Sequence, residues 1–139
     1  MNVFEALIYG LIAEHGLQKD ERKFYFDPFK RNFIPIYYDG MGNLLNEKGK
    51  LSEKQINEIP KFLPSAKNGS SSALVILQNI DLNLLKKDLA KMKLIISEND
   101  LEKILKKIEF NLKFLRSLDD ERLYKISINK KNEIINQNS

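Results

Sequence analysis

Apolar residues recur at helical spacing in several stretches of the chain, and the strongest of these patterns predicts a helix over residues 98–117. Ser97 and Asp100 have the spacing of a capping box, and Ile96 and Leu101 flank this start as a hydrophobic staple. The apolar positions that follow share one helix face: Leu101, Ile104, Leu105, Ile108, Leu112 and Leu115. We therefore expect this face to lie on the core.

Three shorter helices are predicted from similar signals. Residues 3–14 are largely apolar and end at His15 and Gly16, a pair that suits a helix C-terminus. A capping box at Ser52 predicts a helix over 53–59, and Asp81 can cap another over 82–92. The N-terminal helix is apolar on nearly all sides. It is therefore either buried within the domain or packed against a second copy of itself.

The remaining patterns predict strands. Aromatic and β-branched residues over 24–38, broken at Asp27 and Pro28, favour a hairpin, whose second strand contains Pro35 and should lie at an edge. Residues 67–72 resemble a linker. Residues 73–80 form a continuous apolar run typical of a buried strand, with a helix as the alternative, and the alternation over 124–135 favours a second hairpin.

Together these elements predict one α+β domain. We expect a small, mostly antiparallel sheet packed with about four helices over residues 1–135, and a frayed polar tail at 136–139.

Composition narrows the classes of function. The chain has 139 residues, a net charge of +4, one histidine and no cysteine, which excludes disulfides, thiolate zinc sites and multi-histidine metal sites. Gly40 and Gly42 are not followed by the third glycine of a dinucleotide fingerprint. Asp27 and Asp39 could hold Mg²⁺, but they precede Pro and Gly as turn residues do. We therefore expect no enzyme activity, no cofactor and no metal.

The location expected from the sequence is cytoplasmic. The apolar N-terminal stretch is about half the ~20 residues that a membrane-spanning helix needs, and no positive segment precedes it. We therefore expect no membrane association.

The first candidate partner surface is the aromatic hairpin. Its rings are interleaved with Lys23, Lys30 and Arg31, and single-stranded nucleic acids use such surfaces for stacking and phosphate contacts. Alternation along a strand sends half of the rings inward, so we expect most of them to be core. The candidates for the outward-facing positions are Tyr25, Phe29, Tyr37 and Tyr38.

The second candidate surface is on the long helix. Phe110 and Phe114 lie roughly opposite the apolar stripe, on the same side as Lys103, Lys106 and Lys107. Either another part of the chain covers the two rings, or they anchor a partner.

These observations favour a non-enzymatic protein-binding or assembly module, with another protein or a second copy as the partner. An accessory protein of a phage or mobile element would fit this description. The alternative is a nucleic-acid-binding protein that uses the same rings together with Lys23, Lys30, Arg31, Lys103 and Lys107.

Overall fold

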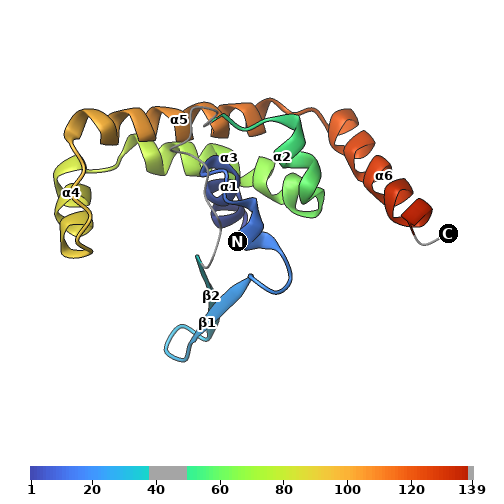
Figure 1. Ribbon diagram of the computed structural model, residues 1–139. Helices are drawn as coiled ribbons and strands as arrows, with labels where there is room; N and C mark the ends of the chain where they lie inside the picture. Colours follow the sequence, from blue (N-terminus) through green and yellow to red (C-terminus); the bar gives the residue numbers. More distant parts are fainter. Residues whose placement is uncertain (38–49, 138–139) are drawn as a thin grey trace.

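A computed structural model describes residues 1–37 and 50–137 and gives an α+β fold. In chain order its elements are α1 (Asn2–Gly10), the 3₁₀ turn η1 (Glu14–Leu17), β1 (Lys23–Asp27), β2 (Asn32–Ile36), α2 (Glu53–Glu58), the 3₁₀ turn η2 (Pro60–Phe62), α3 (Leu63–Gln78), α4 (Leu82–Lys91), α5 (Glu98–Ser117) and α6 (Asp120–Gln137). Helices form the body of the molecule, and the β1–β2 hairpin projects from it (Figure 1).

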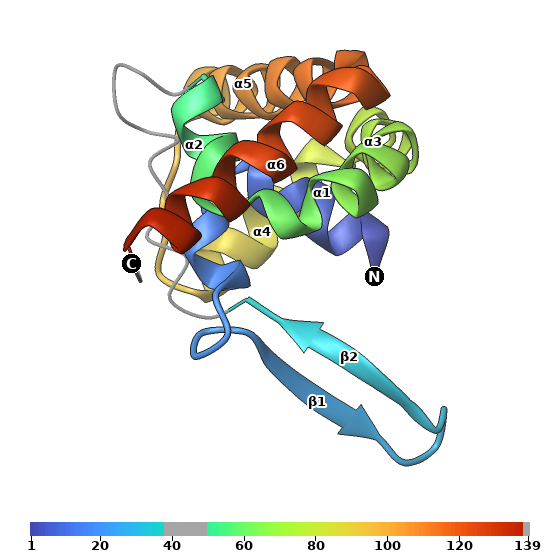
Figure 2. The same cartoon turned by 90° about the vertical axis from the view of Figure 1, so that its right-hand side faces the viewer.

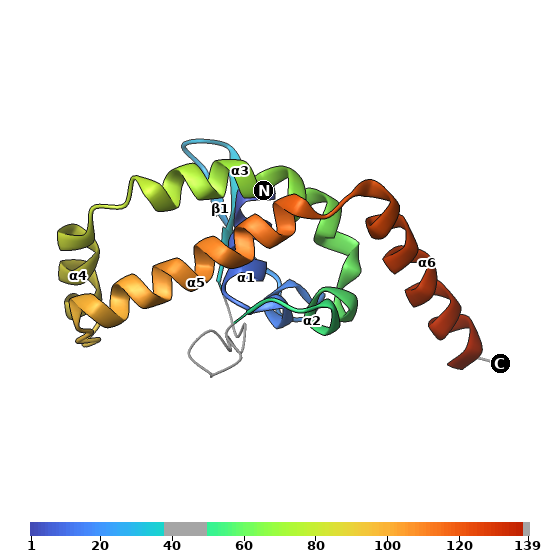
Figure 3. The ribbon, with the colours of Figure 1, turned by 90° about the horizontal axis from the view of Figure 1, so that it is seen from above.

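The core lies where α1 packs against both α3 and α5. Helices α3 and α5 lie side by side and converge at an angle (Figure 3), and α1 lies against both of them on one side (Figure 1). Ala6, Ile8 and Tyr9 of α1 are fully buried. The apolar N-terminal helix is therefore buried within its own domain, which was one of the two alternatives, and not by packing against a second copy.

Helix α1 ends earlier than predicted. The chain leaves it after Gly10, and Ile12 takes a left-handed conformation with φ of 52° before the η1 turn. His15 and Gly16, predicted to end the first helix, lie in η1 instead. Leu112 of α5 packs against Gly10, where a Cβ would lie 3.3 Å from the leucine side chain.

The three helices that were predicted from an N-terminal capping residue form where they were predicted. The capping box of Ser52 and Gln55 begins α2, Asp81 accepts the backbone N–H of Leu84 at the start of α4, and Ser97 accepts that of Asp100 at the start of α5. Leu101, Ile108, Leu112 and Leu115 of α5 are buried, as the spacing of the apolar residues predicted.

The linker predicted over 67–72 and the buried strand predicted over 73–80 are wrong, and the helix given as the alternative is correct, because α3 includes residues 67–78. Small residues here mark a close helix crossing instead of a flexible connection. Gly69 and Ser70 are buried beneath the start of α1, and the Ser70 hydroxyl donates to the Lys67 carbonyl (2.6 Å). The buried positions of α3 recur at helical spacing: Leu63, Ala66, Ser70, Ala73 and Leu74.

The predicted second hairpin over 124–135 is also wrong, because these residues belong to α6. Asp119 begins this helix by accepting the backbone N–H of Arg122 (2.6 Å). Leu123 and Ile126, three residues apart, pack against the core, and the rest of α6 extends away from the body (Figure 3). The sheet of the described residues is therefore the β1–β2 hairpin alone.

Candidate functional site

The β1–β2 hairpin is the most exposed apolar element that the structure describes. Its antiparallel register pairs Lys23 with Ile36, Phe24 with Pro35, Tyr25 with Ile34, Phe26 with Phe33, and Asp27 with Asn32. Asp27 stabilises the turn, because its carboxylate accepts the backbone N–H groups of Phe29 (2.9 Å) and Lys30 (3.1 Å). Asp27 is therefore a turn residue, as its position before Pro28 indicated. Asp39, the other candidate carboxylate, lies outside the described residues.

The register gives the hairpin two apolar faces. Phe24, Phe26 and Phe33 share one face, on which the rings of Phe26 and Phe33 are in contact with centroids 5.1 Å apart. Tyr25, Ile34 and Ile36 share the other. Neither face is covered by the helical body (Figure 2), and even Phe33 is 67% exposed. The expectation that most of these rings are core is therefore wrong, because the hairpin extends away from the helices instead of packing on them.

The predicted partner residues of the hairpin are all at the surface where the structure describes them. Phe29 at the tip is 96% exposed, and Lys30 and Arg31 beside it are exposed. Tyr25 and Tyr37 are about half exposed. Tyr38 lies outside the described residues.

Arg22 fixes the root of the hairpin to the body. Its guanidinium pairs with the buried Glu5 carboxylate of α1 at 2.5 Å, and it lies 4.2 Å from the Phe62 ring centre and 5.4 Å from that of Phe24. Lys19 and Lys61 line the same cleft, which has a volume of about 400 Å³. A buried ion pair and two ring contacts thus hold the first strand at a defined position on the core.

The second predicted surface divides in two. Phe110 of α5 is 47% exposed, and the Lys50 ammonium lies 4.9 Å from its ring centre. Phe114 instead packs against the core, and the guanidinium of Arg122 lies 5.8 Å from its ring centre. The chain therefore covers Phe114 itself, through the start of α6, and leaves Phe110 at the surface.

The lysines of that surface do not join the hairpin. Lys103 is exposed and pairs with Asp100 at 3.5 Å, and Lys107 is half-buried. Helix α5 lies on the opposite side of α1 from the hairpin (Figure 1). The two groups of predicted partner residues therefore form separate surfaces.

Sequence reasoning missed a further apolar surface at the end of the molecule where α4 joins α3 to α5 (Figure 1). Its exposed members are Val75, Ile76, Leu84, Met92, Leu94 and Ile95. The sequence feature that could have indicated this surface is the apolar run after α4. There Lys93 has a left-handed φ of 61°, and the chain turns back toward α5.

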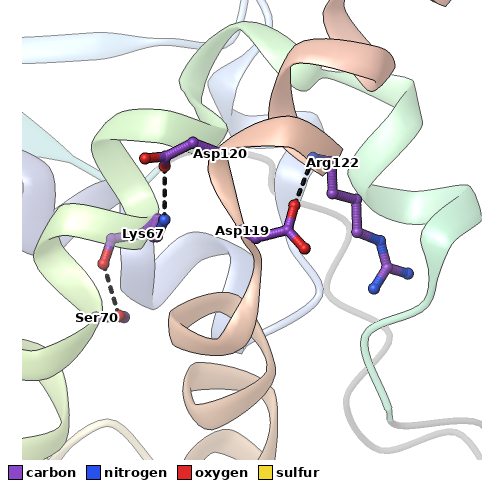
Figure 4. Close-up of polar contacts among 5 residues, drawn as sticks. All are labelled: Lys67, Ser70, Asp119, Asp120 and Arg122. Atoms are coloured by element: carbon purple, nitrogen blue, oxygen red, sulfur yellow. Dashed lines mark hydrogen bonds and ion pairs between the residues drawn. The ribbon is translucent and has the colours of Figure 1, made fainter.

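Polar contacts attach α6 to α3 and α2. The Lys67 ammonium pairs with Asp120 at 2.7 Å, beside the Asp119 cap of α6 (Figure 4), and Arg122 pairs with Glu53. These groups are partly or fully exposed and paired with one another, which is the arrangement of a structural junction.

Two buried titratable groups lie beside α1. Burial raises the pKa of the Glu14 carboxyl, and the nearby Glu58 carboxylate adds to this rise. Burial likewise raises the pKa of Tyr9, whose hydroxyl donates to the Ile59 carbonyl. Within residues 1–37 and 50–137, no three His, Asp or Glu side chains are grouped so that they could hold a metal ion. No helix in these ranges is long and apolar enough to span a membrane.

Comparison with protein-family models, with curated proteins and with solved structures finds no match to this chain.

Proposed function

We propose that this chain is a non-enzymatic, cytoplasmic protein-binding or assembly module whose binding surface is the β1–β2 hairpin. The observation that carries the proposal is the exposure of aromatic and β-branched side chains on both faces of one projecting element. The proposal includes an accessory role in a larger assembly, for which the same surface would be the contact site.

The energetics of an isolated hairpin support this proposal. A two-stranded hairpin is marginally stable in water without a covered face, and each exposed ring retains apolar surface whose burial is favourable by about 25 cal/mol per Å². Tyr and Phe side chains are also common anchors of protein interfaces. A partner that covers one face would supply the core that the hairpin lacks.

The test compares matched surface variants in a capture experiment from extracts of the source cells. The hairpin variant carries Tyr25→Ser, Phe29→Ser and Tyr37→Ser, and the control carries Val75→Ser and Ile76→Ser on α3. All five side chains are at least half exposed, so circular dichroism should show unchanged helix content in both proteins.

We expect the hairpin variant to lose the captured partner and the control variant to retain it. Capture should change little between about 50 and 200 mM salt, because an apolar interface releases few counterions. Equal capture by the hairpin variant and the unaltered protein would overturn the proposal.

The alternative is single-stranded nucleic acid binding, and the hairpin tip favours it. There the fully exposed Phe29 ring adjoins Lys30 and Arg31, which suits base stacking next to phosphate contacts. A labelled oligonucleotide should then bind with an affinity that falls by orders of magnitude from about 50 to 200 mM salt. Lys30→Gln should weaken this binding, and Lys54→Gln on exposed α2 should not.

A further inference from the structure

The two outer edges of the hairpin differ in their capacity to accept another strand. Pro35 of β2 has no N–H, so its pair with Phe24 is a non-hydrogen-bonded pair of the ladder. Alternation then makes Phe26–Phe33 non-hydrogen-bonded as well, which agrees with the close contact of their rings. The backbone groups of these four residues therefore point outward.

Because of this hydrogen-bonding pattern, the outer edge of β1 can accept another strand more readily than the outer edge of β2 can. Phe24 and Phe26 each present an outward N–H and C=O, whereas Pro35 removes a donor from the edge of β2. In Figure 2, β2 lies on the side of the hairpin that faces the helices, and β1 lies on the far side. The open edge thus faces away from the body.

We propose that β1 pairs antiparallel with β1 of a second copy of this chain, about a two-fold axis at Tyr25, to form a four-stranded sheet. This inference rests on the proposed function and names the first partner of the hairpin.

The register follows from the sequence of β1, Lys-Phe-Tyr-Phe-Asp. Residues with outward backbone groups must face one another, so Phe24 pairs with Phe26 of the second copy, and Phe26 with its Phe24. Tyr25 then lies opposite Tyr25 of the second copy. This register uses the whole strand, because every residue from 23 to 27 has a partner.

Charge complementarity selects the same register. Lys23 lies directly opposite Asp27 of the second copy, and the two-fold axis produces this ion pair twice. Asp27 also holds its own turn, and Lys23 donates to the Asp20 carbonyl at 2.5 Å. Neither contact prevents the pairing, because an ammonium has three donors and a carboxylate has about four acceptor positions.

The assembly closes at two copies. A two-fold axis perpendicular to the sheet puts Phe24, Phe26 and Phe33 of both copies on one face, which joins two small aromatic clusters into one. Both outer edges of the four-stranded sheet are then β2, which Pro35 protects against further strands.

A cross-linking experiment tests the register, because the chain has no cysteine of its own. In Tyr25→Cys the two thiols face each other in a non-hydrogen-bonded pair, with Cα atoms about 4.5 Å apart, within reach of a disulfide. In the control, Ile34→Cys, the thiols lie three strand spacings apart, about 14 Å. Mild oxidation at low protein concentration should give a covalent dimer from Tyr25→Cys only.

A second pair of variants separates strand pairing from ring contacts. Phe26→Pro and Phe26→Val both remove the ring, but only the proline also removes the outward N–H. We expect the unaltered protein and Phe26→Val to be dimers by light scattering, and Phe26→Pro to be a monomer with unchanged helix content.

Each remaining outcome has a definite meaning. A monomeric unaltered protein, covalent dimers from both cysteine variants, or equal dimerisation of Phe26→Pro and Phe26→Val would overturn self-pairing through β1. Such a result leaves the proposed function standing if the hairpin variant still loses its captured partner. Retained capture by that variant would overturn the proposed function whatever the cross-linking shows.

Discussion

Asn111 joins three distant parts of the chain with one buried amide. Its oxygen accepts the backbone N–H of Leu51 (2.7 Å), and its nitrogen donates to the Gly10 carbonyl at the end of α1 (2.9 Å). Asn111→Ala would leave both backbone groups buried without this partner, so we expect a loss of about 2–4 kcal/mol in the free energy of unfolding, measured with urea. Asn99→Ala, exposed at the start of the same helix, should change stability by less than about 0.5 kcal/mol.

Gly69 shows how a residue type can mislead a sequence-based prediction. A glycine inside a helix normally costs about 1 kcal/mol relative to alanine, so Gly69→Ala would be expected to stabilise α3. Here the added Cβ would lie 2.7 Å from the Val3 backbone nitrogen and closer still to the Asn2 carbonyl. We expect a net destabilisation of about 1–3 kcal/mol because α1 must shift. Asn68→Ala, exposed beside it, should be neutral or stabilising, and a gain in thermal stability for Gly69→Ala would contradict the close crossing.

Glu14 gives stability a pH dependence of a defined sign. Its pKa is raised in the folded protein, chiefly by burial, so folding favours the protonated carboxyl. The stabilising contribution of that proton is complete below the unfolded value of about 4.3 and is lost as the pH rises through the folded value. Glu14→Gln should therefore raise the Tm at pH 7, and the gain should shrink as the pH falls below about 4. An equal gain at both pH values would contradict this origin.

At the scale of elements, the two phenylalanines of α5 should behave differently. Phe114 packs against the core beneath Arg122, so Phe114→Ala should cost about 2–3 kcal/mol in the free energy of unfolding. Phe110 is about half exposed beside Lys50, so Phe110→Ala should cost less than about 1 kcal/mol. Urea titration of the two single variants measures the difference. Equal costs would show that both rings are core.

The elements that sequence reasoning identified are those specified locally. Helices α2, α4 and α5 each begin at a capping side chain that satisfies their own first backbone N–H groups, and the hairpin has its own turn at Asp27. Helix α6 was missed, and a helix over part of α3 was only the alternative prediction, because the signals of both helices depend on other elements. The small residues of α3 are explained by the N-terminus of α1, which crosses α3 there. The Ile-rich pattern of α6 resembles that of a strand, and its helical character becomes clear only from the packing of its first turns against the core.

At the scale of the whole molecule, the sequence predicted which side chains could form a partner surface better than it predicted how they are arranged. Tyr25, Phe29 and Tyr37 are at the surface as expected, and so is Phe110. The projection of the hairpin from the body could not be predicted, because it depends on where Arg22 meets Glu5 and Phe62. The surface near Ile95 was missed because its apolar run resembles buried chain.

The separation of body and hairpin leads to a last prediction about folding. The fully buried side chains come from outside residues 23–37, so the packing of α1, α3 and α5 does not require the strands. Replacing residues 24–36 with a short Gly-Ser loop should preserve helix content and a single cooperative thermal transition, with the Tm changed by only a few degrees. Arg22 remains in this variant, so its ion pair with Glu5 can still form.

The matched comparison is Leu112→Ala, which removes a fully buried side chain where α5 meets α1. It should cost about 2–5 kcal/mol and lower the transition of the whole molecule, because α1, α3 and α5 share one core. Thermal melts of the two variants, followed by circular dichroism, show whether the hairpin or the helical core controls cooperative unfolding. If the loop replacement abolished cooperative unfolding while Leu112→Ala left it nearly unchanged, the hairpin would be part of the folding unit. Its exposed rings would then have a structural role that a partner need not complete.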